Sequence, residues 1–372
     1  MLIARSVHPL PGESERKERL LALVDGFSSR RVLVLGDLIA DEFIYGDVAR
    51  VSREAPVLIL KYDATQMVAG GAGNAANNVA ALGGRARLAG LVGTDPEGRR
   101  LLASFHRGVD KAQVVRAREY RTPVKTRILA GGVHAARQQV VRIDRETGWP
   151  LDASVSLALA KKIKPAIESC DAVILSDYGS GLVTPILADA IRRAVARRTR
   201  RRPIPVLLDS RYRLLDYRGL TTCTPNESEV EAALGIHMDD DPEALEKAGR
   251  LLLRRTGMQA VLITRGSRGM ALFQPKQATI HVPIFGADEV ADVTGAGDTV
   301  IAAFGLALAA GASFYEAARL ANYAGGLVVM KRGTATVSAH ELSDAVISDH
   351  DTTLENWSQE GPPQGRRSLS RG

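Results

Sequence analysis

The segment from Asp292 to Thr299 joins a glycine-rich turn and a carboxylate to the start of a long apolar stretch. The residues that follow, 300–310, are apolar on nearly every face, so we expect a buried helix that begins near Gly297. The first backbone amides of such a helix have no partners within it, and with the helix dipole they attract an anion. The small residues Gly295, Ala296 and Gly297 leave room for that anion to approach.

Asp298 lies in the first turn of this predicted helix. Because the helix dipole favours a negative charge there, we expect Asp298 to stay ionised at neutral pH and to accept a proton from an attacking hydroxyl. An ordinary glycine turn with an aspartate that helps to cap a helix would have the same sequence. A short motif of this kind therefore needs support from the rest of the chain.

A second glycine-rich turn, residues 70–78, reads GGAGNAANN and runs into another predicted helix. Its asparagines can hydrogen-bond a polyol. The turn also matches the dinucleotide pattern G-x-G-x-x-A, with Asp95 about 20 residues further on, which leaves a dinucleotide-dependent oxidoreductase as an alternative. That fingerprint should follow directly on a buried strand, and residues 62–69 do not read as one, so we favour the sugar-binding interpretation.

Asp37 and Asp41 bracket the end of the first predicted strand, where open α/β sheets usually bind their ligands. Their spacing lets both carboxylates face one pocket, and carboxylates suit sugar hydroxyls. The alternative is a turn aspartate followed by a helix cap.

The segment 224–229, TPNESE, follows a strand-like stretch and opens a helix. Asn226 is a good N-cap, and Glu229 would complete a capping box, so local capping is one interpretation. The other places Asn226 and Glu229 near Mg²⁺ and its waters, because hard oxygen ligands suit a cation that bridges nucleotide phosphates.

Thr264, Arg265 and Gly266 end a further strand, at a position where a cation can neutralise phosphate charge. The chain has neither a Walker A lysine motif nor a protein-kinase catalytic loop. A phosphate-transferring enzyme with this sequence must use a different scaffold.

Short apolar runs alternate with helical patterns along most of the chain, which predicts an α/β fold with a doubly wound, mostly parallel sheet. The expected strands are 31–35, 87–92, 172–175, 205–208 and 260–263, and the expected helices are 96–105, 153–167, 183–196, 226–234 and 242–254.

Residues 55–62 and 123–141 break this rhythm, because both read as extended strands without intervening helices. We expect a small antiparallel sheet, formed by about 43–62 and 121–143, that acts as a lid and excludes water during transfer. The main domain should run from 31 to 347, with its core beginning at Arg31. A polar lead-in with one short helix, 1–30, precedes it, and the polar segment 348–372 should be a disordered tail.

The composition is 45% hydrophobic and 24% charged, which is typical of a globular enzyme. No apolar run is long enough to span a membrane and no secretory signal is present, so we expect a cytoplasmic location and no membrane partner. The net charge of +7 includes an arginine-rich run at 192–202, which we interpret as the solvated end of a helix rather than a nucleic-acid site. Cys170 and Cys223 read as structural thiols.

With these motifs in order, the chain resembles the ribokinase-like sugar kinases of the PfkB family from about Arg31 to Asp344. The segments VAGGAGNAANNVAALGGRARLAGLVGTD, LSDYGSGL, TPNESEV and DVTGAGDTV carry the resemblance. They are most similar to the branch of the family that phosphorylates heptose 7-phosphate.

The resemblance implies transfer of the ATP γ-phosphoryl group, with Mg²⁺, to the anomeric hydroxyl of D-glycero-D-manno-heptose 7-phosphate. The product would be the 1,7-bisphosphate, a precursor of ADP-heptose and lipopolysaccharide. Another sugar or sugar phosphate, such as fructose, fructose 6-phosphate or ribose, remains the alternative. The resemblance also implies a homodimer, because lid strands in this fold often pair between subunits.

The same resemblance assigns roles to individual residues. Asp298 matches the catalytic base, and Gly295, Ala296 and Gly297 match the anion hole. The sugar-contacting positions are Asp37, Asp41, Gly70, Gly71 and Asn74, with Lys125 and Arg127 for the sugar phosphate. The nucleotide and Mg²⁺ positions are Asn226, Glu229, Asp209, Thr264, Arg265, Gly266 and Asn322, and the candidates for a monovalent cation such as K⁺ are Asp292 and Thr294.

One departure from the family pattern follows the strand 205–208, where Asp209, Ser210 and Arg211 replace the common Asp-Pro-Lys. Arginine keeps the charge but changes its reach and hydrogen-bond geometry, so the role of Arg211 stays open.

Overall fold

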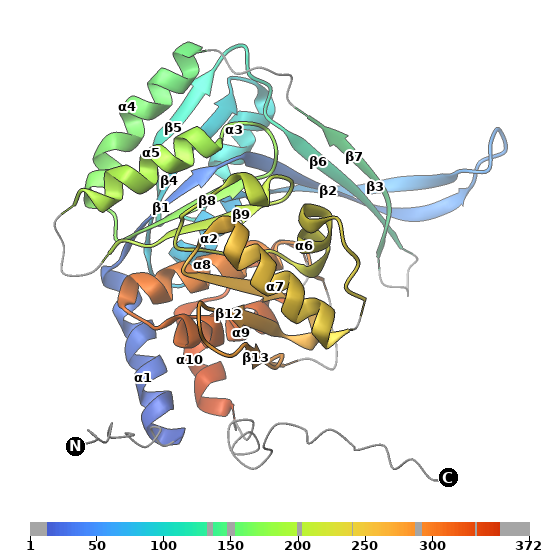
Figure 1. Ribbon diagram of the computed structural model, residues 1–372. Helices are drawn as coiled ribbons and strands as arrows, with labels where there is room; N and C mark the ends of the chain where they lie inside the picture. Colours follow the sequence, from blue (N-terminus) through green and yellow to red (C-terminus); the bar gives the residue numbers. More distant parts are fainter. Residues whose placement is uncertain are drawn as a thin grey trace, which may run out of the picture.

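The computed structural model describes residues 13–131, 137–146, 153–198, 203–239, 241–286, 292–331 and 333–349. Within these ranges the chain forms a nine-stranded sheet with helices on both faces and a separate four-stranded sheet (Figure 1). The order of the large sheet is β13-β12-β11-β10-β9-β8-β1-β4-β5. Its strands are β1 (Arg31–Gly36), β4 (Arg85–Gly93), β5 (Val109–Ala117), β8 (Ala172–Asp177), β9 (Val206–Ser210), β10 (Thr222–Cys223), β11 (Ala260–Thr264), β12 (Met270–Phe273) and β13 (Ile280–Val282).

The pairs from β5 to β11 are all parallel, and β12 and β13 add an antiparallel edge. Side chains of successive strand residues point to opposite faces, so a sheet covered on both faces must have continuous apolar strands. In β1, Val32 and Val34 pack into one hydrophobic cluster, whereas Leu33 and Leu35 pack into the other. The predicted doubly wound α/β fold is therefore confirmed.

The helices divide between the two clusters. One face is covered by α1 (Glu13–Asp25), α2 (Ala72–Ala81), α8 (Ala296–Ala310), α9 (Phe314–Val329) and α10 (Ala339–Ser348). The other face is covered by α4 (Ala153–Ser169), α5 (Pro185–Ala196), α6 (Glu227–Leu234) and α7 (Pro242–Thr256). Helix α3 (Pro96–Ala103) contacts the lid strands, and short 3₁₀ turns occupy Gly26–Ser29, Leu214–Asp216 and Gly266–Arg268.

The hydrophobic core begins earlier than predicted. Leu20, Leu23, Val24 and Phe27 are all buried in the first cluster, ahead of Arg31. Their spacing of three or four residues places them on one face of a helical segment that packs on α8 and α10. At the other end, Asp349 accepts hydrogen bonds from Arg319 and Tyr323 of α9, so the first residues of the predicted tail belong to the packed domain. The rest of that tail lies outside the described residues.

The smaller sheet, which we call the lid, has the order β3-β2-β6-β7. Its strands are β2 (Leu38–Val51), β3 (Leu58–Gly71), β6 (Val124–Gly131) and β7 (Gln138–Arg145). The two outer pairs are antiparallel, and the central pair, β2 with β6, is parallel. The β2–β3 ribbon projects well beyond the rest of the molecule (Figure 1).

Two lid strands are longer than the sequence predicted, because 38–42 and 63–71 are also in strands. The first six residues of β2 are all buried, so this stretch lacks the alternation that reveals a strand. Among the described residues, no helix is both long and apolar enough to cross a membrane.

Candidate active site

A cavity of about 220 Å³ lies between the lid and the carboxyl ends of the central strands. It brings the two glycine-rich segments together, as predicted for ligand sites of open α/β sheets. Its lining consists of Ile39, Asp41, Gly71, Lys125, Arg127, Arg142, Tyr178, Arg211, Thr294, Gly295 and Asp298.

The N-terminus of α8 opens beside this cavity. Gly295 is the N-cap residue with φ of 79°, and no side chain caps the helix. A Cβ atom at Gly295 would lie 2.5 Å from Nδ2 of Asn74, so only glycine fits there. At Gly297 a Cβ atom would meet nothing within 4 Å, which leaves the first amides of α8 accessible to an anion.

Asp298, in the first turn of α8, is only 3% exposed. Its Oδ2 accepts a hydrogen bond of 2.9 Å from Asn74, and its Oδ1 accepts one of 3.1 Å from the hydroxyl of Tyr178. Burial raises the pKa of Asp298 to about 7, although both hydrogen bonds lower it. With a pKa near neutrality, this carboxyl is only partly ionised at pH 7, which differs from the expectation of an ionised group because burial disfavours the charge.

Asp41 faces the cavity from β2 and pairs with Arg127 of β6, with 2.5 Å between Oδ1 and Nη1. The Arg127 guanidinium also lies 5.4 Å from the centre of the Phe43 ring. A Cβ atom at Gly70 would lie only 2.1 Å from Oδ2 of Asp41. Gly70 therefore makes room for the Asp41 carboxylate and does not itself line the cavity.

Asp37 does not line the cavity with Asp41, contrary to the expectation from their spacing. Its Oδ2 accepts backbone hydrogen bonds from Tyr178 and Ser180, of 2.8 and 3.0 Å. Its Oδ1 is buried and accepts no hydrogen bond of good geometry from the described residues, and burial raises the pKa of Asp37 to about 6. Asp37 thus lies beneath the loop that carries Tyr178.

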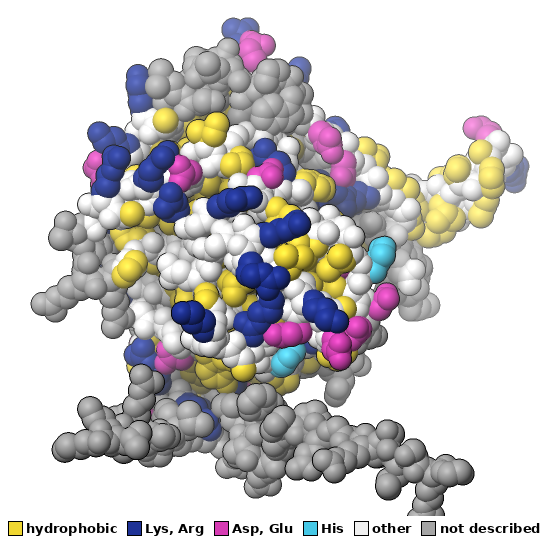
Figure 2. Space-filling model, in the orientation of Figure 1, with side chains coloured by type: hydrophobic (Ala, Val, Ile, Leu, Met, Phe, Trp, Pro, Cys, Tyr) yellow, Lys and Arg dark blue, Asp and Glu magenta, His cyan; other side chains and the backbone are white. Residues whose placement is uncertain are grey.

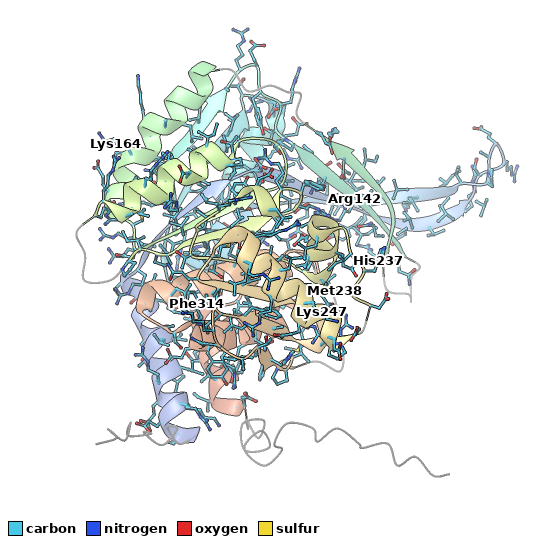
Figure 3. The ribbon with its side chains drawn as sticks, in the orientation of Figure 1. Arg142, Lys164, His237, Met238, Lys247 and Phe314 are labelled. Carbon is cyan, nitrogen blue, oxygen red and sulfur yellow. The ribbon has the colours of Figure 1, made fainter. Side chains whose placement is uncertain are left out.

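Three further cations face the cavity, Lys125 of β6, Arg142 of β7 and Arg211 after β9. Burial and the neighbouring charge of Arg211 lower the pKa of Lys125, whose Nζ lies 5.1 Å from the centre of the Tyr178 ring. Arg142 makes two hydrogen bonds to Asp144, and Figure 3 shows it on the lid sheet. Sequence reasoning missed Arg142, because its place depends on the β6–β7 register.

Asn226 and Glu229 form a capping box at the start of α6. Local capping was one of the two interpretations of this segment. The side chain of Asn226 accepts from the Glu229 amide, and the side chain of Glu229 accepts from the Asn226 amide. Burial raises the pKa of Glu229. Burial and then the charges of Asp298 and Glu229 also hold the pKa of Asp209 well above its ordinary range. These carboxyls are therefore close enough to repel one another.

The other predicted nucleotide residues lie outside the cavity. Thr264 forms a β-bridge with Asn226, so these two are brought together. The guanidinium of Arg265 is paired with Glu227, with 2.9 Å between Nε and Oε1. Gly266 has φ of 55°, and Asn322, buried on α9, donates to the carbonyl of Pro283.

Asp292 and Thr294 adjoin the turn before α8. Oδ1 of Asp292 accepts from the amide of Thr294 over 2.8 Å, and Oδ2 accepts from the amide of Gly333 over 3.1 Å. Across the described part of the chain, no three His, Cys, Asp or Glu side chains converge as direct ligands of a metal ion.

The hydrogen bonds of Asp95 argue against the dinucleotide-binding alternative. Its carboxylate accepts from the amide and hydroxyl of Thr122 and from the amide of Gly98, so it acts as the N-cap of α3. Helix α2 does follow directly on a strand, but that strand is β3 of the lid rather than a buried strand of the parallel sheet.

Three comparisons with known proteins agree with this geometry. A family model described as pfkB family carbohydrate kinase matches residues 29–341. The bifunctional protein HldE of Trichlorobacter lovleyi is 41% identical over 334 residues, covering 88% of this chain and 66% of the relative. HldE of Caulobacter sp. is 42% identical over 336 residues, covering 90% of this chain and 66% of the relative. The chain thus spans slightly less than two thirds of the length of these curated relatives.

Solved structures share the fold. Ribokinase of Arabidopsis thaliana, complexed with ribose and ATP, matches with a TM-score of 0.65 and 21% identity, covering 85% of this chain and 98% of that one. Phosphofructokinase-2 of Escherichia coli, in complex with potassium, matches with a TM-score of 0.68 and 18% identity, covering 86% and 98%. At these identities the likeness concerns the fold alone.

Proposed function

Because this chain belongs to the pfkB family of carbohydrate kinases, we propose that it phosphorylates the anomeric hydroxyl of D-glycero-D-manno-heptose 7-phosphate. ATP is the phosphoryl donor, and the product is the 1,7-bisphosphate used for ADP-heptose and lipopolysaccharide precursors. The HldE relatives, at 41 and 42% identity over most of the chain, support this choice of substrate.

One observation carries the proposal: the carboxyl of Asp298 lies in the same cavity as a group of cations and beside the open N-terminus of α8. Phosphoryl transfer needs an aligned hydroxyl, a proton acceptor and charge stabilisation rather than covalent chemistry from the protein. In the proposed reaction, Asp298 accepts the proton of the anomeric hydroxyl as it attacks. The amides of Ala296 and Gly297 stabilise the charge on the transferred group.

The far phosphate of the sugar is proposed to bind Lys125, Arg142 and Arg211. Lys125 and Arg211 have mutually unfavourable charges, as the lowered pKa of Lys125 indicates, and a dianion between them relieves that repulsion. Arg127 has a different role in this proposal, because it is already paired with Asp41 and holds that carboxylate toward the sugar hydroxyls. Gly71 also lines the cavity.

Mg²⁺ fits the nucleotide side of the site. Asp209 and Glu229 both have raised pKa values, partly through like charges in the case of Asp209, and a divalent cation would offset that repulsion. We propose that these residues and Asn226 hold Mg²⁺ through waters and ATP phosphates, and that Thr264, Gly266 and Asn322 adjoin the nucleotide. When bound, Mg²⁺ supplies neutralisation of phosphate charge.

A monovalent cation is proposed beside Asp292 and Thr294. Among the described residues, each oxygen of the Asp292 carboxylate accepts one backbone amide, and a carboxylate oxygen has a second lone pair that can bind a cation. Replacing K⁺ by choline in the assay should lower activity. We also propose a cytoplasmic location, because the reaction consumes ATP.

The lid supports a proposal of a homodimer. Its two edge strands are β3 and β7, and large apolar side chains stand exposed along the lid. They are Val48, Val51, Val57, Leu58, Tyr62, Val140, Val141 and Ile143. Figure 2 shows yellow side chains on the projecting β2–β3 ribbon. Unpaired edges with apolar side chains favour strand pairing with a second copy. Light scattering that gives a monomer at assay concentrations would contradict this.

The test of the proposed function compares kcat/KM for heptose 7-phosphate, fructose 6-phosphate, ribose and fructose, each with ATP and Mg²⁺. Preference for the heptose phosphate supports the full proposal. Preference for another sugar keeps the kinase and changes the substrate, whereas no transfer to any of them would overturn the proposed phosphoryl transfer.

A further inference from the structure

We propose that Tyr178 is a positioning residue for the base: its hydroxyl favours the ionised form of the Asp298 carboxyl and fixes its orientation. This inference rests on the proposed function for its catalytic consequence, but not for its geometry. Tyr178 lies in the segment LSDYGSGL but is not among the predicted site residues, and its role follows from contacts that only the tertiary structure brings together.

The carboxylate of Asp298 is held at both oxygens. Asn74 of α2 donates to Oδ2 and Tyr178 donates to Oδ1, over 2.9 and 3.1 Å. A carboxylate oxygen accepts two hydrogen bonds in favourable geometry, so each oxygen keeps one position for the proton of the sugar hydroxyl. With both donors in place the carboxyl plane is fixed, which a general base requires before the substrate arrives.

Tyr178 can act only as a donor in this contact. Burial, and next the charge of Asp298, hold the pKa of the Tyr178 phenol well above its ordinary value, so the hydroxyl keeps its proton at any working pH. A donor of this kind stabilises the charged form of its partner and lowers the pKa of that partner. The hydroxyl thereby opposes the effect of burial on Asp298.

The loop that carries Tyr178 is held by hydrogen bonds from its backbone amides to two aspartates. The backbone amides of Tyr178 and Ser180 donate to Asp37, and the amide of Gly179 donates to Asp177 over 3.1 Å. Asp177 in turn accepts from the hydroxyls of Ser210 and Tyr217, over 3.0 and 2.6 Å. These contacts explain why a buried aspartate stands at position 37: it holds the loop rather than the sugar.

The other charges that face Asp298 come from neighbouring elements. Asp41 on β2 raises its pKa, Lys125 on β6 lowers it, and Asp209 at the end of β9 is a further negative neighbour. None of these is altered when the phenol hydroxyl alone is removed. A change in titration on Tyr178→Phe therefore reports the hydrogen bond itself.

The experiment compares the wild type, Tyr178→Phe and a matched control, Tyr323→Phe. Tyr323 on α9 carries a buried ring, and its hydroxyl donates to a different carboxylate, that of Asp349. The first readout is kcat/KM against pH with the sugar phosphate. The second is the titration of the Asp298 carboxyl carbon by ¹³C NMR without substrate, assigned with Asp298→Asn.

In Tyr178→Phe, the Asp298 carboxylate loses a hydrogen bond. The pH midpoint of its titration should therefore rise by about one unit or more. Activity should fall about fivefold near pH 7 for a shift of one unit and recover at higher pH, while Tyr323→Phe keeps the wild-type midpoint. A midpoint unchanged in both readouts, or a loss of activity that is equal at every pH, would overturn the proposal.

Tyr178→Met provides a second variant without the hydroxyl and should also raise the midpoint, although it removes the ring beneath Lys125 as well. If the wild type transfers no phosphate to any sugar, the NMR titration still decides the positioning role. A failure of the proposed function and a failure of this inference are therefore distinguishable.

Discussion

Asn74 donates a hydrogen bond of 2.9 Å to Asp298, although the two residues are 224 positions apart in the chain. This contact joins the two glycine-rich segments, since Asn74 lies in the first turn of α2 and Asp298 in the first turn of α8. It also explains why position 295 is a glycine, because any side chain there would collide with the Asn74 amide. The proposed base and the residue that holds it are thus positioned by two helix N-termini that meet at one cavity.

Replacing Asp298 by Asn should lower kcat by about 10²–10⁴-fold, because an amide cannot accept the proton of the sugar hydroxyl. Steady-state kinetics with ATP and the preferred sugar measures this. The variant should keep the fold, as circular dichroism can verify. Near-normal turnover would show that another group is the base.

The contribution of Asp298 to the stability of the protein should fall as the pH rises from about 4 to 7. The pKa of Asp298 is raised from 3.8 to about 7 in the folded state, so the folded protein binds a proton that the unfolded chain releases. This contribution is fully present below the unfolded pKa and is lost as the pH rises through 7. Asp37, with its pKa raised to about 6, acts in the same direction.

Asp298→Asn removes the larger of these two effects. A shift of about three pKa units corresponds to at most about 4 kcal/mol. The free energy of unfolding of the variant should rise by up to this amount, relative to that of the wild type, as the pH rises from about 4 to 8. Urea unfolding at pH 5 and pH 8 measures the difference. An equal difference between the two proteins at both pH values would contradict the raised pKa.

Gly297→Ala should separate stability from activity. A Cβ atom at this position meets nothing within 4 Å, and alanine is favoured over glycine in a helix by about 0.5–1 kcal/mol. The thermal midpoint should therefore stay the same or rise, whereas kcat should fall because the methyl group occupies space in front of the α8 amides. Unchanged turnover would place the transferred phosphate elsewhere.

Lys125→Met should raise KM for a phosphorylated sugar at least tenfold and change KM for ATP little, because it removes a cation proposed to bind the sugar phosphate. Lys247→Met on α7 is the control, since that side chain is 78% exposed and far from the lid in Figure 3. A parallel rise of both KM values would argue for a general loss of structure instead.

Much of this protein can be derived from its sequence alone. Continuous apolar runs such as that of β1 are required when both faces of a strand are covered, so the parallel sheet was predictable from local composition. The turn around Gly295 and Gly297 and the carboxylate at Asp298 marked a candidate catalytic motif, because their chemistry is encoded by adjacent residues. The resemblance of this and the other motifs to the PfkB family then indicated a sugar kinase.

The tertiary structure decided which of the candidate residues act together. Asp37 and Asp41 are close in sequence but lie on different sides of the Tyr178 loop, and Lys125 meets Arg211 only because the lid packs over the sheet. The protonation of Asp298 also depends on burial by distant segments, and no local pattern reports a desolvation energy. Residue types and helix termini are local properties of the sequence, whereas burial, strand register and the pairing of charges are properties of the folded chain.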